Sequence, residues 1–176
     1  MNPVKERRAI EAALDTYRQL LDTYTDEQFT QTPPMGGWSY AEVYDHIMKA
    51  SLGSSIALER CTHNNCPPTK KGMTFWGYYI LYTGTFPPVK VKVPDAIAAK
   101  MAPKKLDKEE AKNLIIKTRG KIDAIAGLVG DAPPNARWQH PRMGMLNAGQ
   151  WFKFIRIHLQ HHLKQLDRIK SNFINA

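Results

Sequence analysis

The sequence has little cysteine and no long apolar run. Its 176 residues include two cysteines, Cys61 and Cys66, which are too few for the disulfide framework of many small secreted domains. No stretch approaches the roughly 18 consecutive apolar residues that a membrane-spanning helix needs. The charged N-terminus lacks the apolar core of a signal peptide. We therefore expect a cytoplasmic protein with no membrane partner.

The two cysteines also make a poor zinc site. The segment Cys61-Thr-His63-Asn-Asn-Cys66 offers three candidate ligands, whereas structural zinc sites take four, usually from two separated pairs. We interpret Cys61 and Cys66 as ordinary thiols near the end of a helix.

The most basic part of the chain lacks aromatic residues and is poor in arginine. The net charge is +9, and ten Lys or Arg but four Asp or Glu lie between Lys90 and Lys121, with Arg119 as the single arginine. Surfaces that bind nucleic acid usually combine arginine and aromatic side chains with the charge. The segment therefore predicts a solvated lysine face rather than a nucleic-acid site. The alternative is a pocket rim that attracts an anionic substrate.

Apolar residues recur with the helical period over residues 4–22 and in three further segments. Each further segment opens with a pair of residues that can cap a helix by exchanging hydrogen bonds between side chains and backbone. The pairs are Ser39 with Glu42, Asp107 with Glu110 and Asn147 with Gln150, and the helices extend to about Arg60, Gly127 and Asn172. No segment alternates convincingly as a strand does. The sequence predicts an all-α protein, a four-helix bundle.

The connections between these helices are long and rich in proline. Residues 84–106 hold four prolines and no clear period, and residues 131–146 form a second irregular loop. Residues 73–82 fit either a short helix or an apolar loop. A chain of this length, with 43% hydrophobic residues, can bury one core, so we expect a single domain over residues 1–176.

Half of the histidines fall within five positions of the last predicted helix. On a helical wheel His158 and His162 lie on its apolar face, one turn apart, and His161 lies on the flank. His46 lies on the inward face of the second helix among small residues. Facing helices of a bundle are where metal sites are built. The alternative is that these are core histidines hydrogen-bonded to tyrosine, glutamine or backbone, because buried imidazoles need partners.

Two motifs carry a family resemblance. The stretch "GGWSYAEVYDHI", which ends in His46, and the stretch "HLQHHLKQL", which contains His158 and His162, together resemble the DinB-like (YfiT-like) superfamily of four-helix-bundle proteins regarded as metal-dependent enzymes. The shared pattern is a Trp-Ser opening of the second helix, a histidine two turns further on, and His-x-x-x-His on the final helix. Residues 62–106 match nothing in the family pattern.

The resemblance implies a left-handed up-down-down-up bundle with long irregular connections. It implies a divalent ion, zinc, nickel or iron, held by His46, His158 and His162. Dimers are frequent among similar proteins, so the resemblance also suggests a homodimer, with Trp76 and Tyr78–Tyr82 as candidate interface residues. Relatives include thiol-dependent transferases and an isomerase that use low-molecular-weight thiols.

Three neutral imidazoles would leave the ion its full charge and open positions, which suits catalysis better than a closed structural site. Such an ion lowers the pKa of a bound water or thiol. Glu42 and Gln165 are candidates to accept the second ring N–H of a ligand, although the helix cap competes for Glu42. His161 is a candidate substrate contact, with an exposed position beside the site as the alternative, and the loop from His140 to Gly144 makes Arg142 a candidate neighbour of the site.

The functional hypothesis is a metal-dependent transferase or hydrolase that acts on a small molecule, with a low-molecular-weight thiol as a candidate partner. No catalytic residue is assigned. The alternative is a non-catalytic helical-bundle protein with an interaction or stress-response role.

Overall fold

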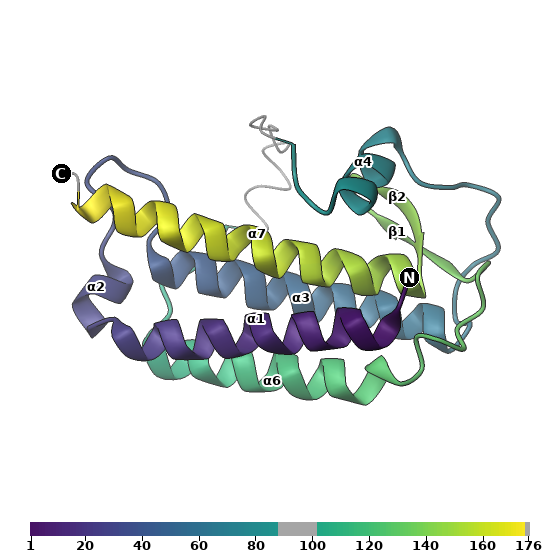
Figure 1. Ribbon diagram of the computed structural model, residues 1–176, viewed down its shortest axis with the longest axis horizontal. Helices are drawn as coiled ribbons and strands as arrows, with labels where there is room; N and C mark the ends of the chain where they lie inside the picture. The colour runs from purple at the N-terminus through teal and green to yellow at the C-terminus, as the bar shows by residue number, and fades with distance from the viewer. Residues whose placement is uncertain (88–101, 175–176) are drawn as a thin grey trace.

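The long helices of the computed structural model form a four-helix bundle (Figure 1). The structure describes residues 1–87 and 102–174. Within these ranges the bundle helices are α1 (Pro3–Thr23), α3 (Tyr40–Thr62), α6 (Lys108–Ala126) and α7 (Ala148–Ile174). Helix α3 packs against α6 and α7, and α1 packs against the same two helices.

The direction of the helices follows the expected order. In Figure 1, α1 and α7 run from right to left, whereas α3 and α6 run from left to right. Consecutive helices α3 and α6 are therefore parallel to each other. The up-down-down-up bundle predicted from the family resemblance is confirmed.

The predicted helix starts are present. Each pair exchanges hydrogen bonds between side chains and backbone amides, as in Asn147 N to Gln150 Oε1 (2.9 Å) and Gln150 N to Asn147 Oδ1 (3.0 Å). These bonds satisfy amides that have no partner inside the helix. The three pairs are Ser39 with Glu42, Asp107 with Glu110, and Asn147 with Gln150.

Two short helices are not part of the four-helix bundle. Helix α4 (Phe75–Thr83) shows that the apolar segment 73–82 is helical rather than a loop. Helix α2 (Asp26–Thr30) lies between the first two predicted helices, in a segment for which the sequence analysis predicted no helix. Thr25 and Gln28 make a capping box there, and the fully buried Phe29 side chain fixes this single turn against the core.

The prediction that the chain contains no strand is wrong for residues 131–146. Strands β1 (Arg137–His140) and β2 (Gly144–Asn147) pair as an antiparallel hairpin. Each strand has four residues, so the alternation is too short to stand out in the sequence. The hairpin continues directly into α7 and fixes its first turn.

Gly144 lets the hairpin pack closely against the segment before α4. Its φ angle is +79°, and a Cβ atom there would lie 2.6 Å from the carbonyl oxygen of Gly72. Backbone hydrogen bonds cross this contact, from Thr74 N to Met143 O (2.9 Å) and from Met145 N to Gly72 O (3.0 Å). Only glycine combines this backbone conformation with so close an approach.

Buried tyrosines tie α1, α3 and α7 together in the core. The Tyr17 hydroxyl donates to the carbonyl of Leu159 (2.8 Å), and the Tyr44 hydroxyl donates to the carbonyl of Tyr17 (2.7 Å). Their rings meet edge to face at 5.3 Å. Both hydroxyl groups are thus satisfied, so the aromatic rings stabilise the core without the cost of an unpaired polar group.

The described part of the basic segment is tied to neighbouring helices. Residues 90–101, on which part of the expected lysine face falls, lie outside the described residues. Beyond them, Arg119 pairs with Asp15 of α1, and Lys121 pairs with Glu59 of α3. Lys108 donates to the carbonyl of Tyr24 (2.6 Å). Much of the charge on α6 therefore joins helices.

Within the described ranges, no helix has the length and apolar character needed to cross a membrane.

Candidate metal centre

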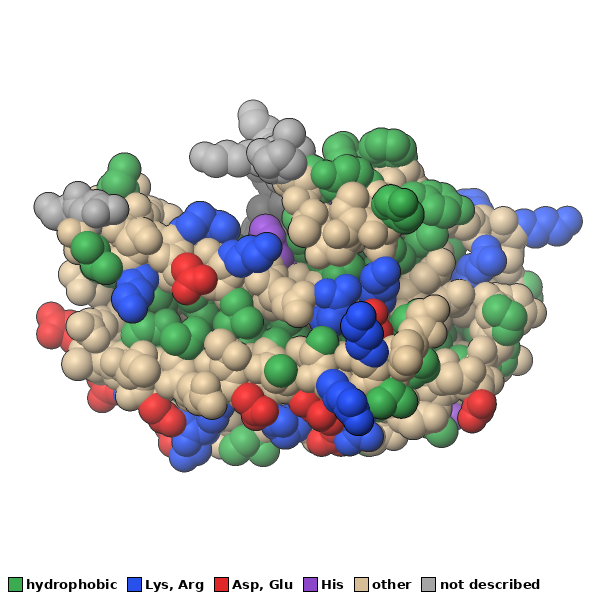
Figure 2. Space-filling model, in the orientation of Figure 1, with side chains coloured by type: hydrophobic (Ala, Val, Ile, Leu, Met, Phe, Trp, Pro, Cys, Tyr) green, Lys and Arg blue, Asp and Glu red, His purple; other side chains and the backbone are tan. Residues whose placement is uncertain are grey.

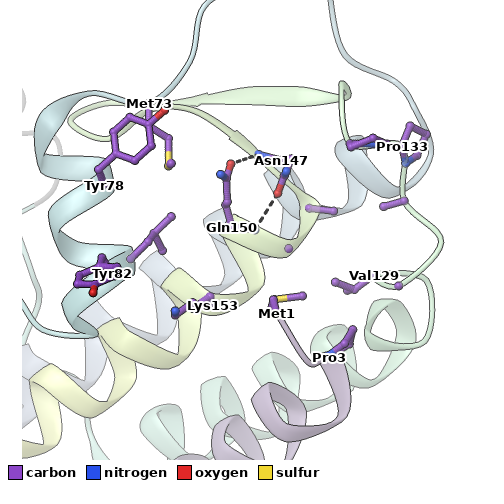
Figure 3. Close-up of a pocket in the computed structure, with 16 residues that line it drawn as sticks. Met1, Pro3, Met73, Tyr78, Tyr82, Val129, Pro133, Asn147, Gln150 and Lys153 are labelled. Atoms are coloured by element: carbon purple, nitrogen blue, oxygen red, sulfur yellow. Dashed lines mark hydrogen bonds between the residues drawn. The ribbon is translucent and has the colours of Figure 1, made fainter.

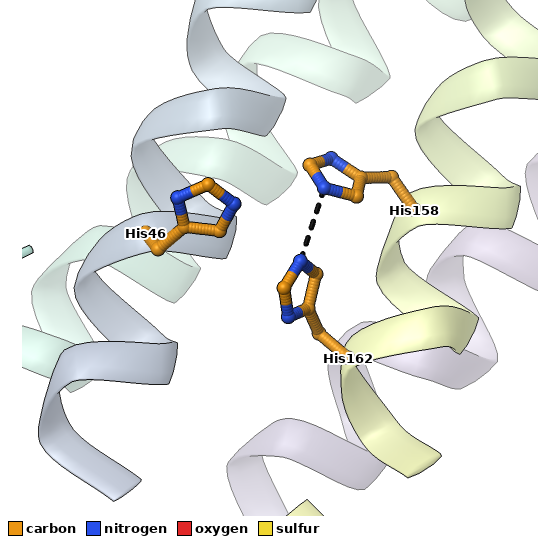
Figure 4. Close-up of side chains that lie close together, drawn as sticks. All are labelled: His46, His158 and His162. Atoms are coloured by element: carbon orange, nitrogen blue, oxygen red, sulfur yellow. Dashed lines mark hydrogen bonds between the residues drawn. The ribbon is translucent and has the colours of Figure 1, made fainter. Parts of the chain in front are cut away.

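His46, His158 and His162 come together in the interior of the bundle. His46 lies in the second turn of α3, and the other two lie one turn apart on α7. One ring nitrogen from each residue lies within 4.8 Å of the others. Figure 4 shows the three rings around a common space. Two nitrogens on one tetrahedral zinc ion stand about 3.3 Å apart, because each Zn–N bond is about 2.0–2.1 Å. Small side-chain movements would therefore suffice to bind one ion.

Hydrogen bonds orient the two α7 imidazoles. His162 Nδ1 lies 2.7 Å from Gln165 Oε1, and His162 Nε2 lies 3.0 Å from His158 Nε2. Since the amide oxygen is an acceptor, the proton of a neutral His162 ring belongs on Nδ1, and the Nε2 lone pair faces His158. Two lone pairs cannot face each other at 3.0 Å without a shared proton or cation. The pair therefore needs either a proton on His158 Nε2 or a metal ion between the rings.

Burial keeps all three rings neutral. It lowers the pKa of His162 to about 3 and the pKa of His158 well below its usual value, and the neighbouring histidines lower both further. Burial also lowers the pKa of His46, against an opposing effect of the Asp45 charge. An imidazole binds a metal ion in its neutral form. The site is therefore ready to accept a cation at neutral pH without first losing protons to water.

Aromatic side chains enclose the three histidines. Trp38 lies 5.0 Å from the His46 ring, and Phe154 stacks on His158 at 5.2 Å with an angle of 26° between the ring planes. Phe86 lies 5.6 Å from His158. These rings limit the access of water and restrict the rotation of the ligands. Sequence analysis did not assign Phe86 or Phe154 to the site. Phe86 belongs to a segment with no periodicity, and Phe154 lies on the buried apolar face of α7 like an ordinary core residue.

Of the two residues predicted to hydrogen-bond to a clustered histidine, Gln165 does so and Glu42 does not. Gln165 contacts His162 as expected. The Oε2 atom of Glu42 accepts from both the backbone N and the hydroxyl of Ser39 (2.8 Å each), so the helix cap uses this carboxylate. Sequence analysis missed Asp45, a buried carboxylate next to His46 that pairs with Lys49 Nζ at 2.5 Å.

His140 lies one aromatic layer away from the cluster. Its ring lies 4.6 Å from Phe154, which in turn stacks on His158. The Nδ1 atom of His140 accepts from the backbone N of Arg142 (3.2 Å) and of Met143 (3.1 Å), which closes the hairpin turn. Burial and the Arg142 charge lower the pKa of His140 to about 4. Arg142 itself is exposed, and its charge acts on His140.

The cysteines lie at the other end of α3. Cys66 Sγ lies 3.7 Å from Cys61 Sγ, and Cys61 Sγ lies 3.6 Å from the carbonyl oxygen of Leu146. Burial raises the pKa of Cys61 to about 12. No metal cluster among the described residues includes either thiol. Both are free thiols near the end of a helix.

A separate cavity of about 800 Å³ lies at the start of α7 (Figure 3). Its lining includes Met1, Tyr78, Tyr82 and Lys153, and none of the three clustered histidines. This cavity is therefore not the metal site. The aromatic residues of α4 beside it are exposed, Tyr82 by 90%, so the homodimer interface predicted there stays a prediction.

The sequence matches the family model described as the DinB superfamily over residues 9–166. The chain therefore belongs to the DinB superfamily, as its two histidine motifs indicated. No curated protein matches the sequence significantly.

Two solved structures share the fold. One is TT2238, described as a four-helix bundle protein, with 18% identity and a TM-score of 0.62, over 95% of this chain and 99% of that one. The other is YfiT from Bacillus subtilis, described as a probable metal-dependent hydrolase with an unusual four-helix bundle topology. It has 14% identity and a TM-score of 0.63, over 96% of this chain and 86% of that one. At such identities the likeness establishes the fold.

Proposed function

We propose that the protein is a metal-dependent enzyme that acts on a small molecule, with His46, His158 and His162 as the ligands of a divalent ion. The observation that carries this proposal is the meeting of three neutral imidazoles from two helices inside the bundle. Other buried positions of α7, such as Ile155 and Leu166, carry apolar side chains, so this face of the helix packs without imidazoles elsewhere.

The residues present fit a catalytic ion better than a structural one. Three imidazoles leave at least one position open for a water or a substrate atom. A divalent ion so held lowers the pKa of a water or thiol that binds to it. The donor set accepts zinc, nickel or iron.

The surrounding side chains have defined roles in this proposal. Gln165 holds the proton of His162 on Nδ1 and so keeps Nε2 free to bind the ion. Phe154 fixes the plane of the His158 ring, and Trp38 covers His46. Together they exclude water from the ligands while leaving the ion's charge uncompensated by any carboxylate ligand.

The reaction class is hydrolysis or the transfer of a group to a low-molecular-weight thiol. The description of YfiT supports hydrolysis, and the family resemblance supports thiol chemistry. A panel of glutathione, bacillithiol, mycothiol and coenzyme A with a generic electrophile, alongside ester and amide substrates, separates the two classes.

The metal content of the purified protein tests the proposal. We expect about one equivalent of a divalent metal by inductively coupled plasma analysis in the wild type, and little in His46→Ala and His158→Ala. His63→Ala is the matched control, since His63 is exposed at the end of α3 and outside the cluster. Equal metal content in all four proteins would show that the histidines form an ordinary core and would support a non-catalytic bundle.

A further inference from the structure

A second cavity adjoins the outer wall of the histidine cluster. It has a volume of about 760 Å³ and lies between α7 and the residues that follow α4. Its lining includes Phe86, Pro87, Ile157 and His161. Figure 2 shows histidine at the surface of a hollow on this face, with lysine or arginine side chains nearby.

Two side chains separate this cavity from the three clustered histidines. Phe86 lies 4.6 Å from the ring of His161 and 5.6 Å from the ring of His158. The ring of His161 lies 5.1 Å from that of His162. A molecule in the cavity is therefore one ring away from the candidate metal ligands. Rotation of the Phe86 side chain would join the two spaces.

The far side of the cavity carries positive charge. Lys164 and Arg168 line it together with His161, and these three positions fall on one face of α7 because they are spaced three and seven residues apart. Both cations act on the His161 ring and lower its pKa, after the larger effect of burial. Asp167 also lines the cavity. The formal balance of the lysine, arginine and aspartate is thus one positive charge.

This arrangement orients a substrate. Along the axis of α7, Lys164 and Arg168 lie about 3 Å and 9 Å beyond His162, at a rise of 1.5 Å per residue. His161, which lines the cavity with these two cations, has its ring 5.1 Å from that of His162. A substrate with its anionic end at these cations can thus reach past Phe86 to the histidine cluster with its other end. The apolar side chains of Phe86, Pro87 and Ile157 suit an uncharged chain between the two ends.

Resting on the metal-dependent function above, we propose that this cavity binds the carboxylate end of a small, elongated substrate. Lys164 and Arg168 bind the carboxylate, and Phe86 and His161 form the wall past which the reacting end meets the metal. His161 and Phe86 then contribute to substrate selection. Sequence analysis offered His161 as a substrate contact and did not assign Phe86.

A pair of thiols that differ in charge tests this assignment. The cobalt(II)-loaded protein is titrated with 6-mercaptohexanoate and with 6-mercaptohexanol, and the sulfur-to-cobalt absorption band gives each Kd. We expect the carboxylate to bind roughly three- to tenfold more tightly, as two partly exposed ion pairs allow. The preference should shrink as salt is added.

Three variants identify the residues responsible. Lys164→Gln with Arg168→Gln should reduce the ratio of the two Kd values to about one and leave the Kd of 6-mercaptohexanol unchanged. Asp167→Asn should increase the ratio, an effect of opposite sign that damage to the fold would not produce. Lys170→Gln is the charge control, because it lies on the same helix and is not part of the cavity lining. An equal Kd for both thiols in the wild type, or an unchanged ratio in the double variant, would overturn the proposal.

The metal-free protein separates this proposal from the one it rests on. If cobalt does not bind, the proposed metal function fails, and the carboxylate site is then tested with hexanoate by NMR titration. Chemical-shift changes at the backbone amides of residues 160–168 that disappear in the double variant would support the site. Their absence would overturn it.

Discussion

The Nδ1 atom of His162 lies 2.7 Å from the side-chain oxygen of Gln165, one turn further along α7. This contact selects the tautomer whose Nε2 lone pair faces His158. We predict that Gln165→Ala lowers the metal affinity about 10- to 100-fold, the usual effect of removing such a partner. Competition with a chromogenic chelator measures it. Gln31→Ala, at an exposed position, should leave the affinity unchanged, and equal affinities in the two variants would contradict the role of Gln165.

Replacing a clustered histidine by an apolar residue should separate stability from metal binding. The His162 side chain is buried and hydrogen-bonded to Gln165 and His158. In the presence of EDTA we expect His162→Leu to melt close to the wild-type temperature, because apolar burial replaces two polar contacts of a neutral ring. Wild-type protein should gain stability when a divalent ion is added, because the ion binds only the folded form. The variant should show no such gain, and a metal-dependent shift as large as that of the wild type would count against His162 as a ligand.

Acidification should destabilise the metal-free protein. Burial lowers the pKa of His140 to about 4, below the value of about 6.5 in an unfolded chain. Between these values the unfolded state binds more protons, so the free energy of unfolding falls as the pH falls from about 6.5 to 4. The clustered histidines act in the same direction. Urea titrations in EDTA at several pH values should show a shallower pH slope for His140→Gln, by up to about 1.4 kcal/mol per pH unit. An identical slope would show that His140 is not protonated on unfolding.

Two glycine substitutions should have opposite effects. Gly144→Ala places a Cβ atom 2.6 Å from the Gly72 carbonyl at a φ of +79°, and we expect it to destabilise the fold by about 1–3 kcal/mol. Gly120→Ala lies in the interior of α6 with no atom within 4 Å of the new Cβ, and should stabilise by about 0.5–1 kcal/mol. Chemical denaturation measures both. Loss of stability in both variants would mean that the approach at Gly144 is not special.

The two thiols should differ in reactivity. Cys61 is fully buried and its pKa is raised to about 12, so little thiolate is available for reaction. Cys66 is partly exposed. We expect a thiol reagent to modify Cys66 first and Cys61 only on a slower timescale. Cys66→Ser should remove the fast phase seen by mass spectrometry, whereas loss of the slow phase instead would reverse the assignment.

The sequence predicted the parts of the fold that depend on local rules. The capping pairs, such as Ser39 with Glu42, and the apolar face around His158 are set by neighbours three or four residues away. These signals located the bundle helices and placed His46 on the inward face of the second one. The histidine pair alone left two alternatives open, and the family motifs were needed to favour a metal.

The features that sequence analysis missed depend on distant contacts. The hairpin of β1 and β2 packs through Gly144 against Gly72, more than seventy positions earlier. Phe86 covers His158 although nothing in its own segment predicts a structure. Asp45 is buried beside a candidate ligand, where its Oδ2 atom accepts from the backbone N of Lys104 (2.9 Å), which lies 59 positions later in the chain. None of these contacts leaves a period or a short motif in the chain.

Helices α3 and α6 point the same way, so the polypeptide must travel back along the whole bundle before α6 can begin. No tight turn can replace this return, whose beginning includes α4 and Phe86. The linker between α3 and α6 must therefore be long, and one part of it, at Phe86, covers His158. The sequence of that linker can therefore change to suit a different substrate while the four bundle helices, and the three histidines on α3 and α7, stay unchanged.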